Sequence, residues 1–399
     1  MTTAATVAPK NQGPEIKAPE IRGWCPGALR PMQSGDGWLV RIRPPGGMLT
    51  PAQAAGIAKA ALAHGNGILD LSLRANLQLR GVQTGSHPAL IDDLSALGLI
   101  DPDIATEASR NVVVTPFWTA GDGTQIIASR LAAALADAPA LPGKFGFAVD
   151  TGLRPVLTGT PADIRLERDA QGNLILRPDG HATGRRITEE AAPDAALTLA
   201  RWFVATGGAA QGRGRMAAHL AEVALPDGFS VPPAAALPPP RPGLVAQGAL
   251  VAFAFGQIAA ETLGQLAALG HDLRLSPWRM LLIAGRDTVP DLPGLVTSCD
   301  DPLLRVTACT GAPGCPQAMG DTRGLARMLA PLVADAAHLH VSGCTKGCAH
   351  PGPAALTLVA TGPGYAFIRN GTASAPPQLT NLLPHQIAAM LKAPDAAPV

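Results

Sequence analysis

Four of the six cysteines lie near the end of the sequence, with spacings that could hold a metal centre. Cys309 and Cys315 form a C-x5-C pair, and Cys344 and Cys348 follow as a C-x3-C pair after 28 intervening residues. Four thiolates can carry a [4Fe–4S] cluster, and sulfur ligands suit iron–sulfur clusters and zinc alike. Structural zinc usually takes tighter C-x2-C pairs, so the spacing favours a [4Fe–4S] cluster, with zinc and inert or disulfide-bonded thiols as the alternatives.

Glycines beside these cysteines would let bare backbone approach inorganic sulfide and donate N–H hydrogen bonds. They are Gly311, Gly314, Gly343 and Gly347. Cys25 and Cys299 lie outside the pattern, and for each we expect the ordinary role of a small buried apolar side chain.

The composition indicates a folded protein with an even charge balance. Lys and Arg number 31 and Asp and Glu 30, so the net charge of +1 argues against binding nucleic acid through bulk positive charge. Hydrophobic residues make up 47% of the chain, which argues against disorder. No apolar stretch approaches the roughly 18 residues of a membrane span, and the N-terminus lacks a secretory pattern, so we expect a cytoplasmic protein.

The elements that must position the cysteines follow a weak internal repeat. Residues 38–43 predict a strand, residues 51–65 a helix capped by Thr50, and residues 67–80 a returning extended segment. Residues 249–255, 259–269 and 273–283 repeat this order, which indicates two related strand–helix–strand units or two ordinary ones alike by chance. The pattern predicts an α+β class with mixed sheets.

Seven prolines between residues 226 and 243 predict a stiff linker that divides the chain. We therefore expect six segments. They are an N-terminal arm (1–34), a first half-domain (35–100), a first α/β domain (101–225), the linker (226–243), a second half-domain (244–305) and a cysteine-bearing α/β domain (306–399).

Several longer motifs extend the cysteine pattern and carry a family resemblance. They are Gly23-Trp-Cys-Pro-Gly-Ala-Leu-Arg-Pro-Met-Gln-Ser-Gly-Asp-Gly37, Arg41-Ile-Arg-Pro-Pro-Gly-Gly47, Leu73-Arg-Ala-Asn-Leu-Gln-Leu-Arg-Gly81, Ser276-Pro-Trp-Arg279 and Ser342-Gly-Cys-Thr-Lys-Gly-Cys-Ala-His-Pro-Gly352. Over roughly residues 20–391 the sequence resembles the sulfite and nitrite reductase family, and within it the precorrin-3B synthase branch of aerobic cobalamin synthesis.

The resemblance implies duplicated ferredoxin-like half-domains, two α/β domains in a pseudo-twofold arrangement, and a tetrapyrrole bound in a basic cleft beside the [4Fe–4S] cluster. In the reductases the tetrapyrrole is siroheme, and the cysteine that Cys348 matches also bridges the cluster to the heme iron. In the synthase branch the tetrapyrrole is the substrate precorrin-3A, and a mononuclear non-heme iron accompanies the cluster. That branch is a monooxygenase: O2 and electrons from NADH hydroxylate a meso carbon, and a ring acetate closes a γ-lactone.

Such a substrate is rimmed by carboxylates, which arginine forks bind well. Arg41 and Arg43 lie two apart on a predicted strand and so share a face. The substrate-binding candidates are Arg41, Arg43, Arg74, Arg80, Arg110, Lys144 and Arg279. The alternative for each is a solvated position or a structural ion pair. For Asn76 and Gln78 we favour strand hydrogen bonding over ligand contact.

Two positions depart from the reductase pattern. The reductases commonly carry Lys-Phe-Lys where this chain has Lys144-Phe-Gly146, and they tend to carry an arginine where Asp70 stands. Both changes reduce positive potential, which weakens the case for sulfite, nitrite and siroheme. A siroheme-dependent sulfite or nitrite reductase is the alternative enzyme, and a tetrapyrrole or electron carrier is the alternative outside enzymes.

The remaining chemistry is less defined by the sequence. Reaction of O2 with an organic substrate needs a redox metal or flavin, and His340 and His350 are candidate ligands of a mononuclear iron, with ordinary strand and loop-capping roles favoured. No catalytic residue is assigned. The glycines at 207–214 lack dinucleotide-binding spacing, so we expect an external ferredoxin or NADH-dependent reductase as electron donor. The internal duplication makes a monomer plausible.

Overall fold

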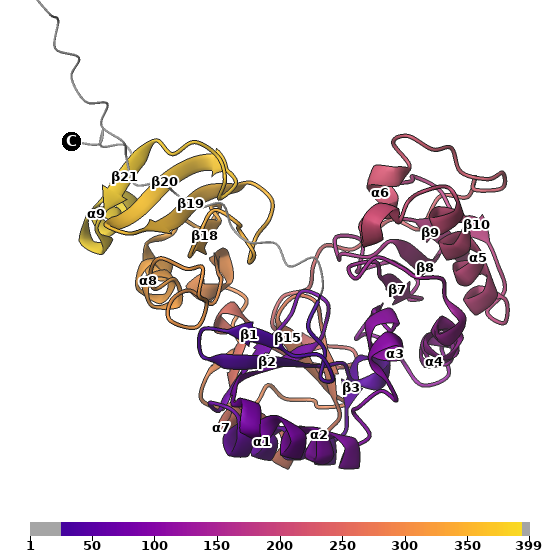
Figure 1. Cartoon of the computed structure of the whole chain (residues 1–399), viewed down its shortest axis with the longest axis horizontal. Helices are drawn as coiled ribbons and strands as arrows, with labels where there is room; N and C mark the ends of the chain where they lie inside the picture. The colour runs from indigo at the N-terminus through magenta and orange to yellow at the C-terminus, as the bar shows by residue number, and fades with distance from the viewer. Residues whose placement is uncertain (1–24, 393–399) are drawn as a thin grey trace, which may run out of the picture. The chain divides into compact units, whose positions relative to one another are not determined.

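The computed structural model describes residues 25–392, which form two compact units (Figure 1). The larger unit extends to Leu304, and the smaller one begins at Arg305. Residues 1–24 of the expected N-terminal arm lie outside the described residues. Among the described helices, none is long and apolar enough to cross a membrane.

In the larger unit one series of elements occurs twice. The first series is β1 (Met32–Ser34), β2 (Gly37–Ile42), η1 (Pro45–Gly47), β3 (Met48–Leu49), α1 (Pro51–His64), β4 (Ile68–Leu71) and β5 (Leu77–Val82). The second series is β11 (Gly243–Val245), β12 (Gly248–Phe253), η5 (Ala254–Gly256), β13 (Gln257–Ala259), α7 (Ala260–Ala268), β14 (Leu273–Leu275) and β15 (Met280–Ala284), after which β16 (Leu295–Val296) pairs with β12.

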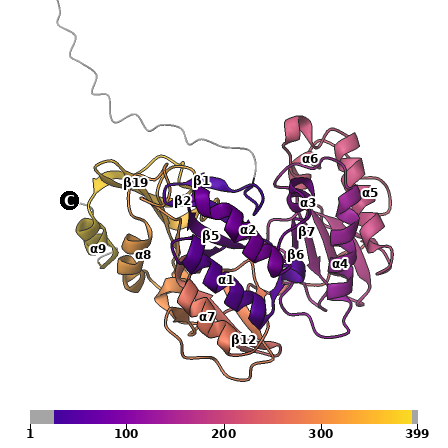
Figure 2. The same cartoon turned by 60° about the horizontal axis from the view of Figure 1, so that its bottom comes forward.

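Helix α1 begins where the sequence predicted. The Gln53 amide donates to the Thr50 side chain at 3.2 Å and the Thr50 amide donates to the Gln53 side chain at 3.0 Å, so both form a capping box ahead of a first-turn proline. The buried residues of α1 include Ala54, Ile57 and Ala61, at the spacing of one helix face. Helices α1 and α7 pack together, as Figure 2 shows.

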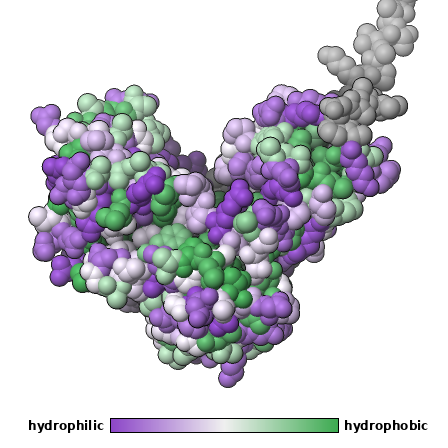
Figure 3. Space-filling model, turned by 180° about the vertical axis from the view of Figure 1, so that it is seen from behind, coloured by the Kyte–Doolittle hydropathy of each residue, from purple (hydrophilic) through white to green (hydrophobic). Residues whose placement is uncertain are grey.

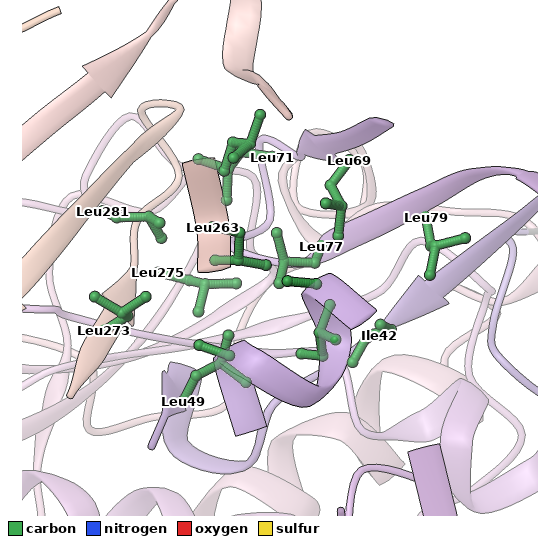
Figure 4. Close-up of a cluster of buried hydrophobic side chains, with 14 of the residues drawn as sticks. Ile42, Leu49, Leu69, Leu71, Leu77, Leu79, Leu263, Leu273, Leu275 and Leu281 are labelled. Carbon is green, nitrogen blue, oxygen red and sulfur yellow. The ribbon is translucent and has the colours of Figure 1, made fainter. Parts of the chain in front are cut away.

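The two series exchange their short strands. One sheet has the order β1-β2-β5-β4-β13 and the other β11-β12-β15-β14-β3, so each contains one strand from the other series. Ile258 of β13 faces Leu69 of β4, and Leu49 of β3 faces Leu273 of β14. Leucines of both series consequently meet in one core (Figure 4).

The turns that follow β4 and β14 support a true repeat. Ala75 has φ 52° and Arg279, at the matching position, has φ 62°. Ser72 donates its amide to Asn76 at 2.9 Å, and Ser276 donates its amide to Met280 at 3.1 Å. These left-handed positions are rare for side chains other than glycine. They also break each predicted extended segment into a hairpin.

Along the chain, a first α/β layer follows the first series and precedes the second. Its sheet has the order β10-β9-β8-β7-β6, in which β6, β7 and β8 are parallel. After η2 (Thr84–Ser86) and α2 (His87–Ala96), which packs against α1, its elements are α3 (Ile104–Ser109), β6 (Val112–Val114), α4 (Thr124–Ala134), η3 (Leu135–Asp137), β7 (Phe147–Asp150), β8 (Ile164–Arg168), β9 (Leu174–Pro178), β10 (Arg185–Arg186), α5 (Ala192–Ala205), η4 (Ala210–Gly212) and α6 (Met216–His219).

The proline-rich segment packs along this layer. Val231 forms a bridge with Gly184, and Pro233 forms one with Asp169. The Leu237 amide donates to the Pro155 carbonyl at 2.8 Å. Within the larger unit this segment is therefore held against the sheet over part of its length.

The smaller unit has the same strand order. Its sheet is β17-β18-β19-β20-β21, with β17, β18 and β19 parallel. After η6 (Pro302–Arg305), which spans the boundary, its elements are β17 (Val306–Ala308), α8 (Arg323–Leu329), η7 (Ala330–Leu332), β18 (Leu339–Ser342), β19 (Ala354–Thr361), β20 (Gly364–Gly371), β21 (Leu379–Leu382) and α9 (Pro384–Lys392). Helix α8 ends ahead of Pro331, which lacks an amide donor.

Candidate functional site

The cysteines follow the ends of parallel strands in the smaller unit. Cys309 comes directly after β17, and Cys344 comes two residues after β18 ends. Parallel neighbours end at the same edge of a sheet, so the loops that carry the four cysteines start from one edge. The Cys309 amide continues the ladder by donating to the Val341 carbonyl at 3.3 Å.

Close backbone packing holds these loops together. The Gly343 amide donates to the Cys309 sulfur at 3.1 Å, a hydrogen bond of the kind that tunes cluster ligands. A Cβ at Gly343 would stand 2.6 Å from the Ala318 Cβ, so only glycine fits there without a shift. In the first loop, the Cys315 amide donates to the carbonyl of Gly311, which has φ 70°.

The four thiols also influence one another electrostatically. Burial, followed by the charges of Cys315 and Cys309, raises the pKa of the Cys344 thiol, although the Lys346 ammonium and an amide hydrogen bond act the other way. Desolvation and the other three cysteines raise the pKa of Cys348, although its side chain is partly open to solvent. Gathered thiolates repel one another, and iron charge would relieve that repulsion.

The donor set fits a cluster better than a single ion. Zinc would need its ligand sulfurs about 2.3 Å from one point. In residues 25–392, no group of three or more His, Cys, Asp or Glu side chains could hold a single metal ion. A [4Fe–4S] cube offers a separate iron to each thiolate. Cys309, Cys315, Cys344 and Cys348 therefore fit the cluster, with zinc as the weaker alternative.

The two histidines considered as iron ligands lie near this region. His340 is fully buried on β18, and its ring centroid is 5.7 Å from that of His350. The His350 Nε2 is 3.1 Å from the Pro353 carbonyl oxygen, which is the loop-capping role favoured from the sequence. The His338 ring lies 4.6 Å from His350 and contacts Thr307.

Four of the predicted substrate-binding cations lie near one another in the larger unit. Arg41 on β2 and Arg43, which directly follows β2, are both buried, and the pKa of Arg43 falls to about 10 because of burial and the charge of Arg41. The charge of Arg110 also acts on Arg43. Burial lowers the pKa of Arg74, with a further contribution from the positive charges of Arg215 and Arg41.

Arg41 is the more open of the two buried arginines in its hydrogen bonding, since Arg43 leaves only its Nε without a partner within the described chain. It is 8% exposed, and its Nε and Nη1 groups donate no hydrogen bond within the described chain. Burial lowers its pKa, and the nearby Cys25 thiol partly offsets this effect. A buried guanidinium with open donors suits an anionic ligand.

Two other arginines have carboxylate partners. The Arg80 Nε is 2.9 Å from Asp36 and its Nη1 is 3.3 Å from Asp70. The Arg110 Nε is 2.7 Å from Asp101. Arg80 and Arg110 therefore match the alternative of a structural ion pair. The Asp70 carboxylate on β4 offsets the positive charge of Arg80 on the neighbouring strand β5.

Lys144 and Arg279 lie on turns. Lys144 is exposed, and its carbonyl accepts a hydrogen bond from Arg74 at 2.8 Å. Arg279 is half-buried at the left-handed turn before β15. Gly146 stands where the reductases carry a second lysine, and a Cβ there would lie 3.1 Å from the Arg74 Nη1. A lysine at 146 would therefore press against Arg74.

Sequence reasoning missed two residues that shape this region. Glu107 accepts hydrogen bonds from the amides of Ala28 and Leu29 and lies 3.8 Å from Arg43. Arg215 holds Asp163 at 2.8 Å. Both come from segments without a motif. The two cysteines outside the pattern also differ from the expected buried state, because Cys25 is half-buried and Cys299 is exposed.

Comparison with known proteins places the fold in one class. Residues 30–97 match the family described as the nitrite/sulfite reductase ferredoxin-like half domain. The solved structure of the Mycobacterium tuberculosis NirA protein is similar, with a TM-score of 0.61 and 17% identity over 89% of this chain and 79% of that one. The duplicated half-domains and paired α/β layers are thus a nitrite and sulfite reductase fold.

The curated relatives narrow this class. The chain is 33% identical to a precorrin-3B synthase of Sinorhizobium sp in an alignment 395 residues long. The alignment covers 89% of this chain and 84% of the relative. It is 34% identical to a chloroplastic ferredoxin–nitrite reductase of Oryza sativa subsp. japonica over 80 residues, or 20% of this chain and 13% of that one. The chain belongs to the precorrin-3B synthase family of the sulfite and nitrite reductases.

Proposed function

We propose that this enzyme converts precorrin-3A to precorrin-3B in aerobic cobalamin synthesis. One atom of O2 hydroxylates a meso carbon and a ring acetate closes a γ-lactone. The second oxygen atom leaves as water, with two electrons that originate from NADH. The observation that carries the proposal is the 33% identity to a precorrin-3B synthase over 89% of the chain.

The arginines would hold the substrate by its carboxylates. The buried Arg41 and Arg43 and the half-buried Arg74 form a positive group in the larger unit. The acetates and propionates of a precorrin would supply anions to the open donors of Arg41, whereas Glu107 already faces Arg43. Lys144 and Arg279 would add contacts at its edge, whereas Arg80 and Arg110 would keep the frame rigid through their ion pairs.

Cys309, Cys315, Cys344 and Cys348 would hold a [4Fe–4S] cluster, which when bound supplies one-electron transfer. The Gly343 amide would stabilise the Cys309 thiolate through the hydrogen bond at 3.1 Å. A mononuclear non-heme iron belongs to the proposal with unassigned ligands. An external ferredoxin or NADH-dependent reductase would deliver electrons, because the chain shows no dinucleotide fingerprint. We propose a cytoplasmic monomer.

Iron and labile-sulfide analysis of anaerobically purified protein, with an absorption spectrum, tests the cofactor. We expect about four iron and four sulfide per chain, plus any mononuclear iron, and a broad iron–sulfur shoulder. Incubation with precorrin-3A, O2 and an electron-transfer system should then add one oxygen atom by mass. An intact cluster without mass gain would instead indicate a tetrapyrrole or electron carrier.

A siroheme-dependent sulfite or nitrite reductase is the second candidate, favoured by the short nitrite reductase match. Gly146 and the Asp70–Arg80 pair both reduce the free positive charge that a small anion would need. Strong siroheme absorption bands in the purified protein would establish this candidate over the monooxygenase.

A further inference from the structure

A cavity of about 1010 Å³ lies at the first α/β sheet, and its lining includes none of Arg41, Arg43 and Arg74. Thr115 follows β6, Asp150 ends β7 and Arg168 ends β8, and all three residues line it. Because β6, β7 and β8 are parallel, the cavity sits at their carboxyl edge, where open α/β sheets bind ligands. In the smaller unit, the corresponding edge carries the cysteine loops.

The cavity has apolar and aromatic walls. Phe117 and Trp118 line one part, and the Phe117 ring stacks with Trp278 at 6.1 Å between centroids. The proline-rich segment lines another part through Leu237 and three prolines that have no amide donor. Arg154 anchors this wall by donating to the Ala235 carbonyl at 3.0 Å.

Asp150 carries the one buried acceptor atom without a hydrogen-bond partner among the charged lining residues of the described chain. Its Oδ2 accepts the amides of Val156 and Leu157, each at 2.7 Å. Its Oδ1 is buried and accepts no hydrogen bond from described residues, in a residue only 3% exposed. The other charged lining side chains each have partners: Asp122, Arg154, Arg168 and Glu189. A buried carboxylate oxygen is costly to leave unpaired.

We propose that this cavity binds a flat, apolar molecule that donates an N–H hydrogen bond to Asp150. Three carboxylates and two guanidiniums line the cavity, so it favours a neutral or cationic ligand over an anion. A polycarboxylate tetrapyrrole is consequently a poor occupant. The site is separate from the proposed substrate group and does not depend on the proposed function.

Titration of the full-length protein with N-phenyl-1-naphthylamine tests this site. The probe is neutral, aromatic and carries one N–H donor, and its fluorescence rises in apolar surroundings. We expect saturable binding by the wild type and about tenfold weaker binding by Asp150→Asn, whose amide would place a donor against the probe's N–H. Asp137→Asn, an exposed change that does not line the cavity, should bind like the wild type.

A further variant and a charged analogue of the probe also test the proposed site. Gly152 lines the cavity with no atom closer than 3.6 Å to a built Cβ, so Gly152→Trp should fold and reduce binding. The sulfonated analogue 8-anilinonaphthalene-1-sulfonate should bind at least about tenfold more weakly, because its charge faces an excess of carboxylate. Three results would each overturn the proposal. They are unsaturable binding by the wild type, wild-type affinity in both Asp150→Asn and Gly152→Trp, and tighter binding of the sulfonate than of the neutral probe.

Discussion

Arg80 and Arg110 meet carboxylates at ion-pair distance, whereas Arg41 is buried with two donor groups open. After burial, the charge of Arg41 is the next factor that lowers the pKa of Arg43. This difference separates arginines that hold the frame from those available to an anionic ligand. Partner distances decide it, and sequence spacing could not, because neither Asp36, which lies inside a motif, nor Asp101, which lies outside every motif, is marked by its spacing as the partner of a particular arginine.

Replacing Arg41 should therefore affect substrate binding more than stability. We expect Arg41→Gln to raise the KM for precorrin-3A about tenfold or more, since a charge-assisted hydrogen bond to a substrate carboxylate is lost. Steady-state kinetics would measure this, with Arg130→Gln, an exposed arginine on α4, as the control. An unchanged KM with a large fall in the thermal midpoint would assign Arg41 a structural role instead.

The raised pKa of Asp150 predicts how the stability of the protein depends on pH. Burial raises its pKa to about 6. A raised carboxyl pKa means that its contribution to stability is present below the unfolded value of 3.8 and is lost as pH rises through about 6. Asp150→Asn should therefore stabilise the protein at pH 7.5 by on the order of 2 kcal/mol, with the advantage vanishing near pH 4. Denaturant unfolding at both pH values measures it, and a pH-independent difference would contradict it.

At the scale of elements, local signals in the sequence located most of the fold. The helix cap at Thr50 and the repeat of strand and helix both follow from short stretches of sequence. The exchange of β3 and β13 between sheets could not be read in the same way, because a two- or three-residue strand has no periodicity to place it. Glu107 and Arg215 were missed for a similar reason, since their partners are far away in sequence.

The close contact between Gly343 and Ala318 predicts the effect of a larger side chain at residue 343. A methyl group at residue 343 would collide with the Ala318 Cβ at 2.6 Å, so Gly343→Ala should separate the loops and lower labile sulfide per chain by about half or more. The double variant Gly343→Ala/Ala318→Gly moves the methyl group across the contact and should restore sulfide content.

Gly362→Ala is the matched control, because a built Cβ there lies 3.8 Å from its nearest neighbour, the Met319 side chain. Equal sulfide content in Gly343→Ala and the wild type would show that this contact does not determine cluster retention. Failure of the double variant to recover would show that the hydrogen bond to Cys309, and not the methyl contact, is the sensitive feature.

On the scale of the whole molecule, the larger unit is a pair of series that complete each other. Apolar side chains from both series lie in one buried cluster. On the surface, polar and apolar residues are interspersed over the face drawn in Figure 3. The duplication could be read from the sequence as two similar modules. The structure makes them interdependent, because each sheet ends in a strand from the other series.

This interdependence predicts where the chain can be cut. A chain that ends at Leu304 keeps both series and should unfold in one cooperative transition, as expected of a compact unit. A chain that ends at Leu225 loses β13, the partner of β4, and the leucines of α7, β14 and β15 that share the core with the first series. It should bind hydrophobic dye and lack cooperative unfolding, because β4 becomes an open edge and the core is half empty. Near-ultraviolet circular dichroism with urea unfolding of the two chains would compare them, and a cooperative transition in the shorter chain would show that the first series folds alone.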